Sequence, residues 1–208
     1  EKEVGFADPG PPAEKDQRSR HQAPAEHTVD DLEDLKPFDI RNLTCHGMPV
    51  VVSRTGYTGD LGYELWIDPA HAAALWDAIF AVRGLYDIHL IGLDALEMVR
   101  IEAGFIMPGF DFNCAEMTIR DGYARSPYEV GLGWVVHLDK GHFTGRKALR
   151  LEKEEPPRRR LTKLVVDGNK PVGEAFIYAG KNGKQVGEIK CTTWSPILKA
   201  NLAIADID

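Results

Sequence analysis

The chain has 208 residues, of which 43% are hydrophobic and 27% charged, values typical of a globular protein. Its net charge of −7, from 25 basic and 32 acidic side chains, argues against a nucleic-acid-binding surface. No hydrophobic run approaches the roughly 18 residues that a membrane-spanning helix needs, so we expect no membrane association. The three cysteines lie far apart and form no CxxC pair, which favours a reducing compartment over a disulfide framework or a zinc site.

Residues 1–36 differ in composition from the rest of the chain. Gly10-Pro11-Pro12 and the polar run from Glu14 to Gln22 show neither a helical nor an alternating hydrophobic pattern. Such a composition buries too little hydrophobic surface to offset the entropy lost on ordering. We expect residues 1–36 to be a disordered or foreign segment.

Two strands and a glycine-rich turn are predicted next. The β-branched run Pro49–Ser53 indicates a buried strand, and Tyr63–Ile67 indicates a second strand with Glu64 and Trp66 on one face. Between them, Gly56, Gly59 and Gly62 recur every three residues. The spacing predicts a turn that either is a plain hairpin loop or lets the backbone approach a ligand closely.

Two helices follow. Asp68 is the expected N-cap of the first, with Pro69 at its first position and Gly84 beyond its end. The second is predicted over Leu93–Ala103, ending at Gly104, with Glu97 and Arg100 one turn apart and able to pair.

The remainder of the chain is predicted to be mostly β-structure. We expect an irregular connection over 107–127, a short strand over 133–138, and a helix over 146–153 capped by Thr144. Strands are predicted over 163–166 and 185–189, with Asn182-Gly183 in a hairpin turn. The fold class is therefore α+β, with a mixed α/β segment over 37–112 followed by a small β-rich segment over about 128–208.

Glu64 and Trp134 are the side chains whose chemistry suits a planar ligand. A carboxylate at Glu64 would accept two N–H donors from a flat heterocycle, or would simply be a surface residue. Trp134 would stack on such a ring, or would belong to the core. His137 and His142 have no carboxylate between them, so we expect no metal site, and no residue stands out as a nucleophile.

Five motifs in order resemble the glycine-cleavage T-protein (aminomethyltransferase) family. Arg54–Leu65 is similar to the family signature RTGYTGE-x-G-[FY]-E, and Gly92–Gly104 to GLxARDxLRLEAG. Three shorter elements follow: Ser126-Pro127 with Gly133-Trp134, then Phe143–Arg146, then Thr192–Pro196.

The resemblance implies a tetrahydrofolate-dependent one-carbon transferase with a T-protein-like fold. It implies part of a ferredoxin-like α/β domain that binds folate over 37–112, a connection over 113–127, and a small β-barrel domain over 128–208. Both ends would be incomplete. In this family the positions of Tyr57, Glu64 and Trp134 line the folate site, so the resemblance assigns these three residues to tetrahydrofolate binding.

Departures from the family pattern keep alternatives open. Leu96 stands where aminomethyltransferases have an arginine, and relatives fused to dehydrogenases often have a leucine there. The alternatives are a folate domain of a dimethylglycine or sarcosine dehydrogenase-like or demethylase system, and a non-catalytic folate-binding fragment. The family region that carries the catalytic aspartate has no counterpart in residues 1–36, so no catalytic residue is assigned and little activity is expected of this chain alone.

The resemblance also implies partners and a location. The expected partners are a small-molecule one-carbon donor or a lipoyl carrier protein, with a flavoprotein in the dehydrogenase-like alternative. The expected compartment is the cytoplasm, or the mitochondrial matrix in a eukaryote.

Overall fold

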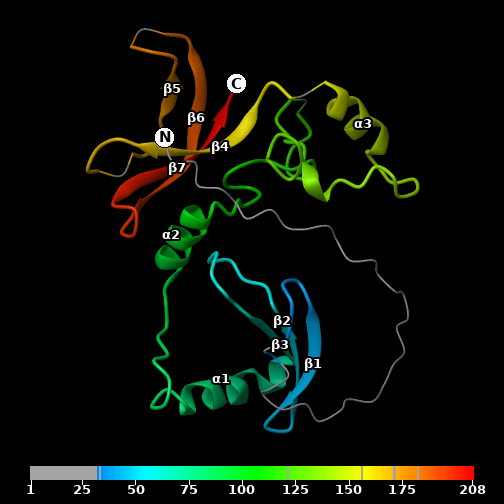
Figure 1. The fold of residues 1–208 in the computed structure, drawn as a ribbon, viewed down its shortest axis with the longest axis vertical. Helices are drawn as coiled ribbons and strands as arrows, with labels where there is room; N and C mark the ends of the chain where they lie inside the picture. Colours follow the sequence, from blue (N-terminus) through cyan, green and yellow to red (C-terminus); the bar gives the residue numbers. More distant parts are fainter. Residues whose placement is uncertain (1–31, 33, 121, 156, 171, 182) are drawn as a thin grey trace.

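A computed structural model describes residues 32, 34–120, 122–155, 157–170, 172–181 and 183–208. Two antiparallel sheets and three α-helices make up this part of the chain (Figure 1). The expectation of a disordered segment falls mainly on residues outside the described part. Within it, Leu35 is buried in the core and Leu32 packs against that core, so the folded part reaches back to Leu32.

The first sheet has the order β1-β2-β3 and is antiparallel throughout. Its strands are β1 (Ile40–Cys45), β2 (Met48–Ser53) and β3 (Glu64–Ile67), so both predicted strands are present. Val50 and Val52 of β2 point to the covered face and form the core there with Leu75. The pairing places Val51 beside Trp66 and Ser53 beside Glu64, on the opposite face.

The first predicted helix begins where the sequence places it. The side chain of Asp68 accepts a hydrogen bond from the backbone N–H of Ala70, 2.8 Å away, and starts a 3₁₀ turn, η2 (Pro69–His71). The turn continues as α1 (Ala72–Ala81), whose Leu75 and Ile79 pack on the sheet. The helix ends three residues before Gly84.

The second helix, α2 (Leu93–Ala103), has the predicted bounds. Gly104 adopts a left-handed backbone with φ of 74°, and its N–H caps the carbonyls of Arg100 and Ile101. Ile101 packs with Leu202 and Ile204 of the second sheet. Figure 1 shows α2 between the two sheets.

The second sheet has the order β4-β7-β6-β5. Its strands are β4 (Arg160–Val166), β5 (Phe176–Tyr178), β6 (Gln185–Ser195) and β7 (Ala200–Ile207). Strand β7 lies inside the sheet and is the most buried of the four. In the described residues the sheet is open, with β4 and β5 at its edges, so it does not close into the expected barrel. Asn182 of the expected hairpin turn lies outside the described residues.

Two local predictions for the part of the sequence between β3 and β4 are wrong. The strand expected over 133–138 is instead a single 3₁₀ turn, η3 (Gly133–Val135), whose N–H groups bond back to the preceding turn. Helix α3 (Arg146–Glu154) is present, but Gly145, with φ of 90°, occupies the N-cap position and Thr144 does not cap it. A left-handed glycine precedes each of these elements, Gly131 with φ of 77° before η3 and Gly145 before α3, and redirects the chain there.

The arrangement confirms the α+β class, since helices and antiparallel strands occupy separate parts of the chain. The domain boundaries stay a prediction. No helix in the described part of the chain is long and hydrophobic enough to cross a membrane.

Candidate functional site

The glycine-rich turn joins β2 to β3 and closes on itself. A Cβ placed on Gly56 would lie 3.5 Å from the Cα of Gly62, so the two ends of the turn are in contact. Gly59, at the tip, has φ of +84°, and a Cβ placed on it would lie 2.6 Å from the Cβ of Ala103. Because only glycine fits this approach, the turn rests on the C-terminal end of α2.

Glu64 is the first residue of β3 and lies exposed at the end of this turn. The hydroxyl of Thr55 donates a short hydrogen bond to its Oε2 atom. Ser53 Oγ lies 2.7 Å from Thr55 Oγ1, and Trp66 Nε1 donates to Ser53 Oγ over 3.5 Å. Since the Thr55 proton goes to the carboxylate, Ser53 donates to Thr55, and the donors run in one direction towards Glu64.

This chain of donors fixes one oxygen of the carboxylate and leaves the other open. No described side chain or N–H group bonds to Oε1 of Glu64. A carboxylate oxygen accepts up to two hydrogen bonds, so Oε2 also keeps a vacant lone pair. The arrangement presents an oriented acceptor pair to whatever lies over this face of the sheet.

Tyr57 lies in the turn and is held from two sides. Its hydroxyl donates to the backbone carbonyl of Ile106 over 3.0 Å, and its ring stacks on Phe105 with 5.6 Å between centroids and 22° between planes. Burial raises the pKa of the Tyr57 hydroxyl, so the group remains a donor at neutral pH.

Trp134 lies in η3 and is 65% exposed. The preceding residue, Gly133, packs against the ring of Tyr128, where a Cβ would lie 2.7 Å from Cδ1. The indole is therefore accessible for stacking, and Trp134 does not belong to the core. In the described residues no hydrogen bond or ring contact links Trp134 to Tyr57 or Glu64.

A buried ion pair behind the turn was missed by the sequence analysis. Arg100 and Asp111 are 1% and 0% exposed, with Nη1 and Oδ2 only 2.6 Å apart. Arg100 also pairs with Glu97, as predicted. Burial disfavours the charge of Arg100, but the hydrogen bonds with Glu97 and Asp111 outweigh burial and raise its pKa. The sequence signal available was an arginine between Val99 and Ile101, on the face of α2 that packs inward.

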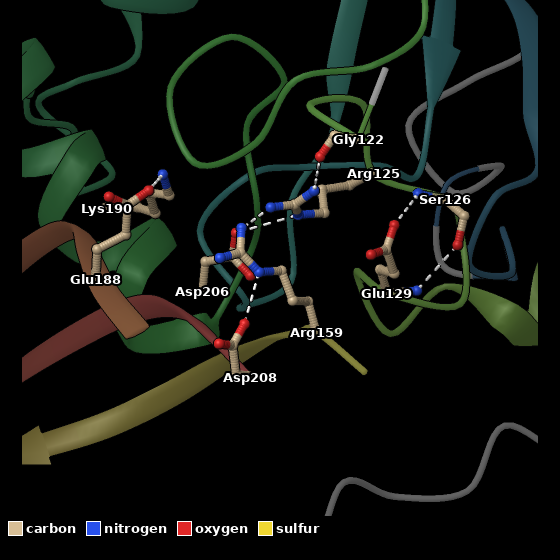
Figure 2. Close-up of polar contacts among 9 residues, drawn as sticks. All are labelled: Gly122, Arg125, Ser126, Glu129, Arg159, Glu188, Lys190, Asp206 and Asp208. Carbon is tan, nitrogen blue, oxygen red and sulfur yellow. Dashed lines mark hydrogen bonds and ion pairs between the residues drawn. The ribbon is translucent and has the colours of Figure 1, made fainter. Parts of the chain in front are cut away.

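A cavity of about 600 Å³ lies elsewhere, between the 110–125 segment and the second sheet. Its walls carry three ion pairs, shown in Figure 2: Arg125 with Asp206, Arg159 with Asp208, and Lys190 with Glu188. None of Tyr57, Glu64 and Trp134 lines it. Its charged groups neutralise one another, so we base the ligand site on the turn rather than on this cavity. Among the described residues no three His, Cys, Asp or Glu side chains are grouped to hold a metal ion.

The chain matches a protein-family model, the GCVT N-terminal domain, over residues 22–140. The chain belongs to this family. The match includes the glycine-rich turn, Glu64, α2 and the Arg100–Asp111 pair. It begins within the segment that the sequence analysis treats as foreign.

Similar curated proteins fall into two kinds. A trimethylamine-oxide aldolase from Ruegeria pomeroyi is 43% identical over 165 residues, which are 78% of this chain and 19% of that protein. An aminomethyltransferase from a Thermotoga species is 35% identical over 184 residues, which are 88% of this chain and 47% of that protein. The GCVT-family chain thus spans about half the length of the aminomethyltransferase and a fifth of the aldolase.

A solved structure has the same fold. The glycine cleavage system aminomethyltransferase T from Bartonella henselae superposes with a TM-score of 0.66 at 22% identity, covering 80% of this chain and 44% of that one. The T-protein-like fold inferred from the motifs is therefore confirmed.

Proposed function

We propose that this chain is the folate-binding part of a tetrahydrofolate-dependent one-carbon transferase of the glycine-cleavage T-protein type. The observation that carries the proposal is the line of donors from Trp66 through Ser53 and Thr55 to Glu64. It fixes a carboxylate beside a glycine-rich turn while leaving acceptor positions open. A fixed carboxylate with open acceptor positions is the arrangement expected of a residue that binds a ligand.

A pterin ring suits the open acceptors of Glu64. It presents an amino group and a ring N–H side by side, and a carboxylate receives such a donor pair with both oxygens. Hydrogen bonds to a charged group are worth about 1.5–3 kcal/mol each when they are partly shielded from water. Trp66, 61% exposed on the same face of the sheet as Glu64, supplies hydrophobic area next to the acceptors.

Tyr57 and Trp134 are the proposed aromatic contacts. The hydroxyl of Tyr57 is committed to Ile106, so Tyr57 would offer the edge or free face of its ring to a ligand. Trp134 would stack from the η3 turn, a contact that requires the ligand to bridge from the first sheet to the 126–145 segment. Bound tetrahydrofolate would supply the nitrogen that accepts the one-carbon unit, and the protein would orient the donor carbon against it.

A second function has its own support. The 43% identity to a trimethylamine-oxide aldolase, together with Leu96 in place of the arginine of aminomethyltransferases, favours a folate domain that serves another catalytic unit. In that case the one-carbon unit would arrive from a neighbouring domain or from a flavoprotein. In the transferase reading it would arrive from a small-molecule donor or a lipoyl carrier protein. These partners and the compartment stay predictions.

Intrinsic fluorescence tests folate binding by this chain. Titration with 5-methyltetrahydrofolate should quench tryptophan emission with saturation, and Trp134→Phe should remove a large part of the quenching. Trp76→Phe is the matched control, because Trp76 is 52% exposed but belongs to α1, where its ring lies tilted against that of Phe80. Saturable quenching that is lost equally in both variants would contradict the assignment of Trp134, and linear, unsaturable quenching would contradict the function.

A further inference from the structure

The backbone on which Tyr57 rests is itself anchored by the buried ion pair. Arg100 Nη1 donates to the carbonyl of Phe105 over 3.0 Å, and Asp111 Oδ2 accepts from the N–H of Met107 over 2.7 Å. The two bonded residues flank Ile106, whose carbonyl receives the Tyr57 hydroxyl. Phe105 carries the ring on which Tyr57 stacks.

We propose that the Arg100–Asp111 pair is the positioning element for Tyr57, so that its integrity sets the affinity of the site for the pterin. This inference rests on the proposed function. The pair does not touch the ligand: both side chains are almost fully buried. It acts by holding residues 105–107 at the place where Tyr57 meets them.

The geometry explains why a charged pair stands here. One neutral hydrogen bond would fix only one peptide group of the segment. Here Nη1 of Arg100 bonds both Phe105 and Asp111, and Asp111 bonds on to Met107. The second arm of the guanidinium, Nη2, bonds Glu97 and holds the group in place. Three residues of a loop are thereby tied to the end of α2. The same helix end supports the tip of the turn at Gly59. Tyr57 is thus fixed from its own backbone and from its ring.

The electrostatic environment of Tyr57 agrees with this proximity. Burial has the largest effect on the pKa of its hydroxyl, followed by the charges of Arg100, which lowers the pKa, and Asp111, which raises it. Glu97, which also bonds Arg100, raises the pKa as Asp111 does. Removal of Arg100 or Asp111 would therefore change the balance of charge acting on the hydroxyl.

The test combines a probe of Tyr57 with a double-mutant cycle on the full chain. The protein is labelled with 3-fluorotyrosine, and the fluorine resonance of Tyr57 is identified by its loss in Tyr57→Phe. Asp111→Asn keeps the shape of Asp111 but removes its charge. The matched control is Asp206→Asn, which breaks a comparably buried pair with Arg125 that makes no hydrogen bond to residues 105–107 in the described part of the chain.

We expect Asp111→Asn to shift or broaden the Tyr57 resonance, and Asp206→Asn to leave it in place. Asp111→Asn should weaken binding of 5-methyltetrahydrofolate at least about threefold when Tyr57 is present, as expected for residues coupled in one network. In a Tyr57→Ala background the same substitution should have no further effect. A role confined to stability would weaken binding equally in both backgrounds.

Loss of a buried partner can prevent folding, so Arg100→Lys provides a second variant. It keeps the positive charge but replaces the two planar nitrogens, of which Nη1 bonds Phe105 and Asp111 and Nη2 bonds Glu97, by a single ammonium group. An unchanged Tyr57 resonance in the folded pair variants overturns the positioning role, whether or not folate binds. If the variants shift the Tyr57 resonance but the parent protein binds no folate, the positioning of Tyr57 stands. Its link to the pterin and the proposed function are then overturned.

Discussion

Gly59 at the tip of the β2–β3 turn lies directly against Ala103 at the end of α2. A Cβ added to Gly59 would approach the Cβ of Ala103 to 2.6 Å, well inside van der Waals contact. This approach connects the first sheet, which carries Glu64, with the helix that packs on the second sheet. The turn is therefore part of the proposed site and also the place where the first sheet contacts α2.

The first prediction is that Gly59→Ala destabilises the protein by two additive causes. An alanine at φ of +84° costs about 1–2 kcal/mol, and forcing its methyl group onto Ala103 costs about 1–3 kcal/mol more. Urea denaturation should show the combined loss in the free energy of unfolding. Gly47→Ala is the control, because Gly47 has φ of +78° with no atom near its missing Cβ. Equal losses for the two variants would show that the contact with Ala103 is absent in solution.

The second prediction concerns the start of the first helical segment. Asp68→Ala removes the acceptor for the N–H of Ala70 and should lower the free energy of unfolding by about 0.5–2 kcal/mol. Asp68→Asn keeps a side-chain oxygen in the same place and should lose less than half as much. The two midpoints in urea, compared at unchanged slope, measure the difference. A larger loss for asparagine than for alanine would argue against capping.

The third prediction is that Cys191 resists alkylation. Burial, followed by the nearby carboxylate of Asp111, raises the pKa of the Cys191 thiol to about 12. Iodoacetamide reacts with the thiolate, so at pH 8 the folded protein should leave Cys191 unmodified while the urea-unfolded protein reacts fully. Mass spectrometry of the labelled peptide distinguishes these cases. Rapid labelling of Cys191 in the folded state would contradict its burial against the core of Ile101 and Ile204.

The same shift has a consequence for stability at high pH. The unfolded thiol loses its proton near its usual pKa of 9.0, whereas the folded thiol keeps it up to about 12. Between these values the unfolded state binds fewer protons, so the contribution of Cys191 to the free energy of unfolding falls as pH rises. Cys191→Ala should reduce this dependence, as measured by urea denaturation from pH 8 to pH 11. An unchanged slope against pH would assign the effect to other groups.

Local sequence signals predicted the elements that are determined locally. Helix α2 was predicted to the residue because a hydrophobic period and a left-handed Gly104 define both of its ends. Strand β7 escapes prediction, although it is the most buried strand, because Asn201 and Asp206 interrupt its short hydrophobic run. Both are buried only through partners distant in sequence, Gly168 and Arg125. Strand β1 was missed because its exposed Ile40 and Asn42 give no clear alternation.

The candidate site, too, is predictable from the sequence only where its residues are close together in the chain. Glu64 and the glycine-rich turn stand next to each other in the sequence, and the structure shows the hydrogen bonds that join them. The Arg100–Asp111 pair joins a helix to an irregular segment eleven residues away, and nothing in the local pattern of that segment marks Asp111 as buried. Sequence spacing predicts pairs one helical turn apart, such as Glu97 with Arg100, but not pairs that depend on the path of a loop.

The central claim is that Glu64 binds a pterin, and titration calorimetry with 5-methyltetrahydrofolate tests it most directly. Glu64→Gln keeps the shape of the side chain but places a donor against the ligand's own N–H groups, so the affinity should fall at least roughly tenfold, or about 1.4 kcal/mol. Asp60→Asn, which removes the same charge from the same exposed turn, should leave the affinity unchanged. Equal affinities of Glu64→Gln and the parent protein, or an equal loss in Asp60→Asn, would contradict the account.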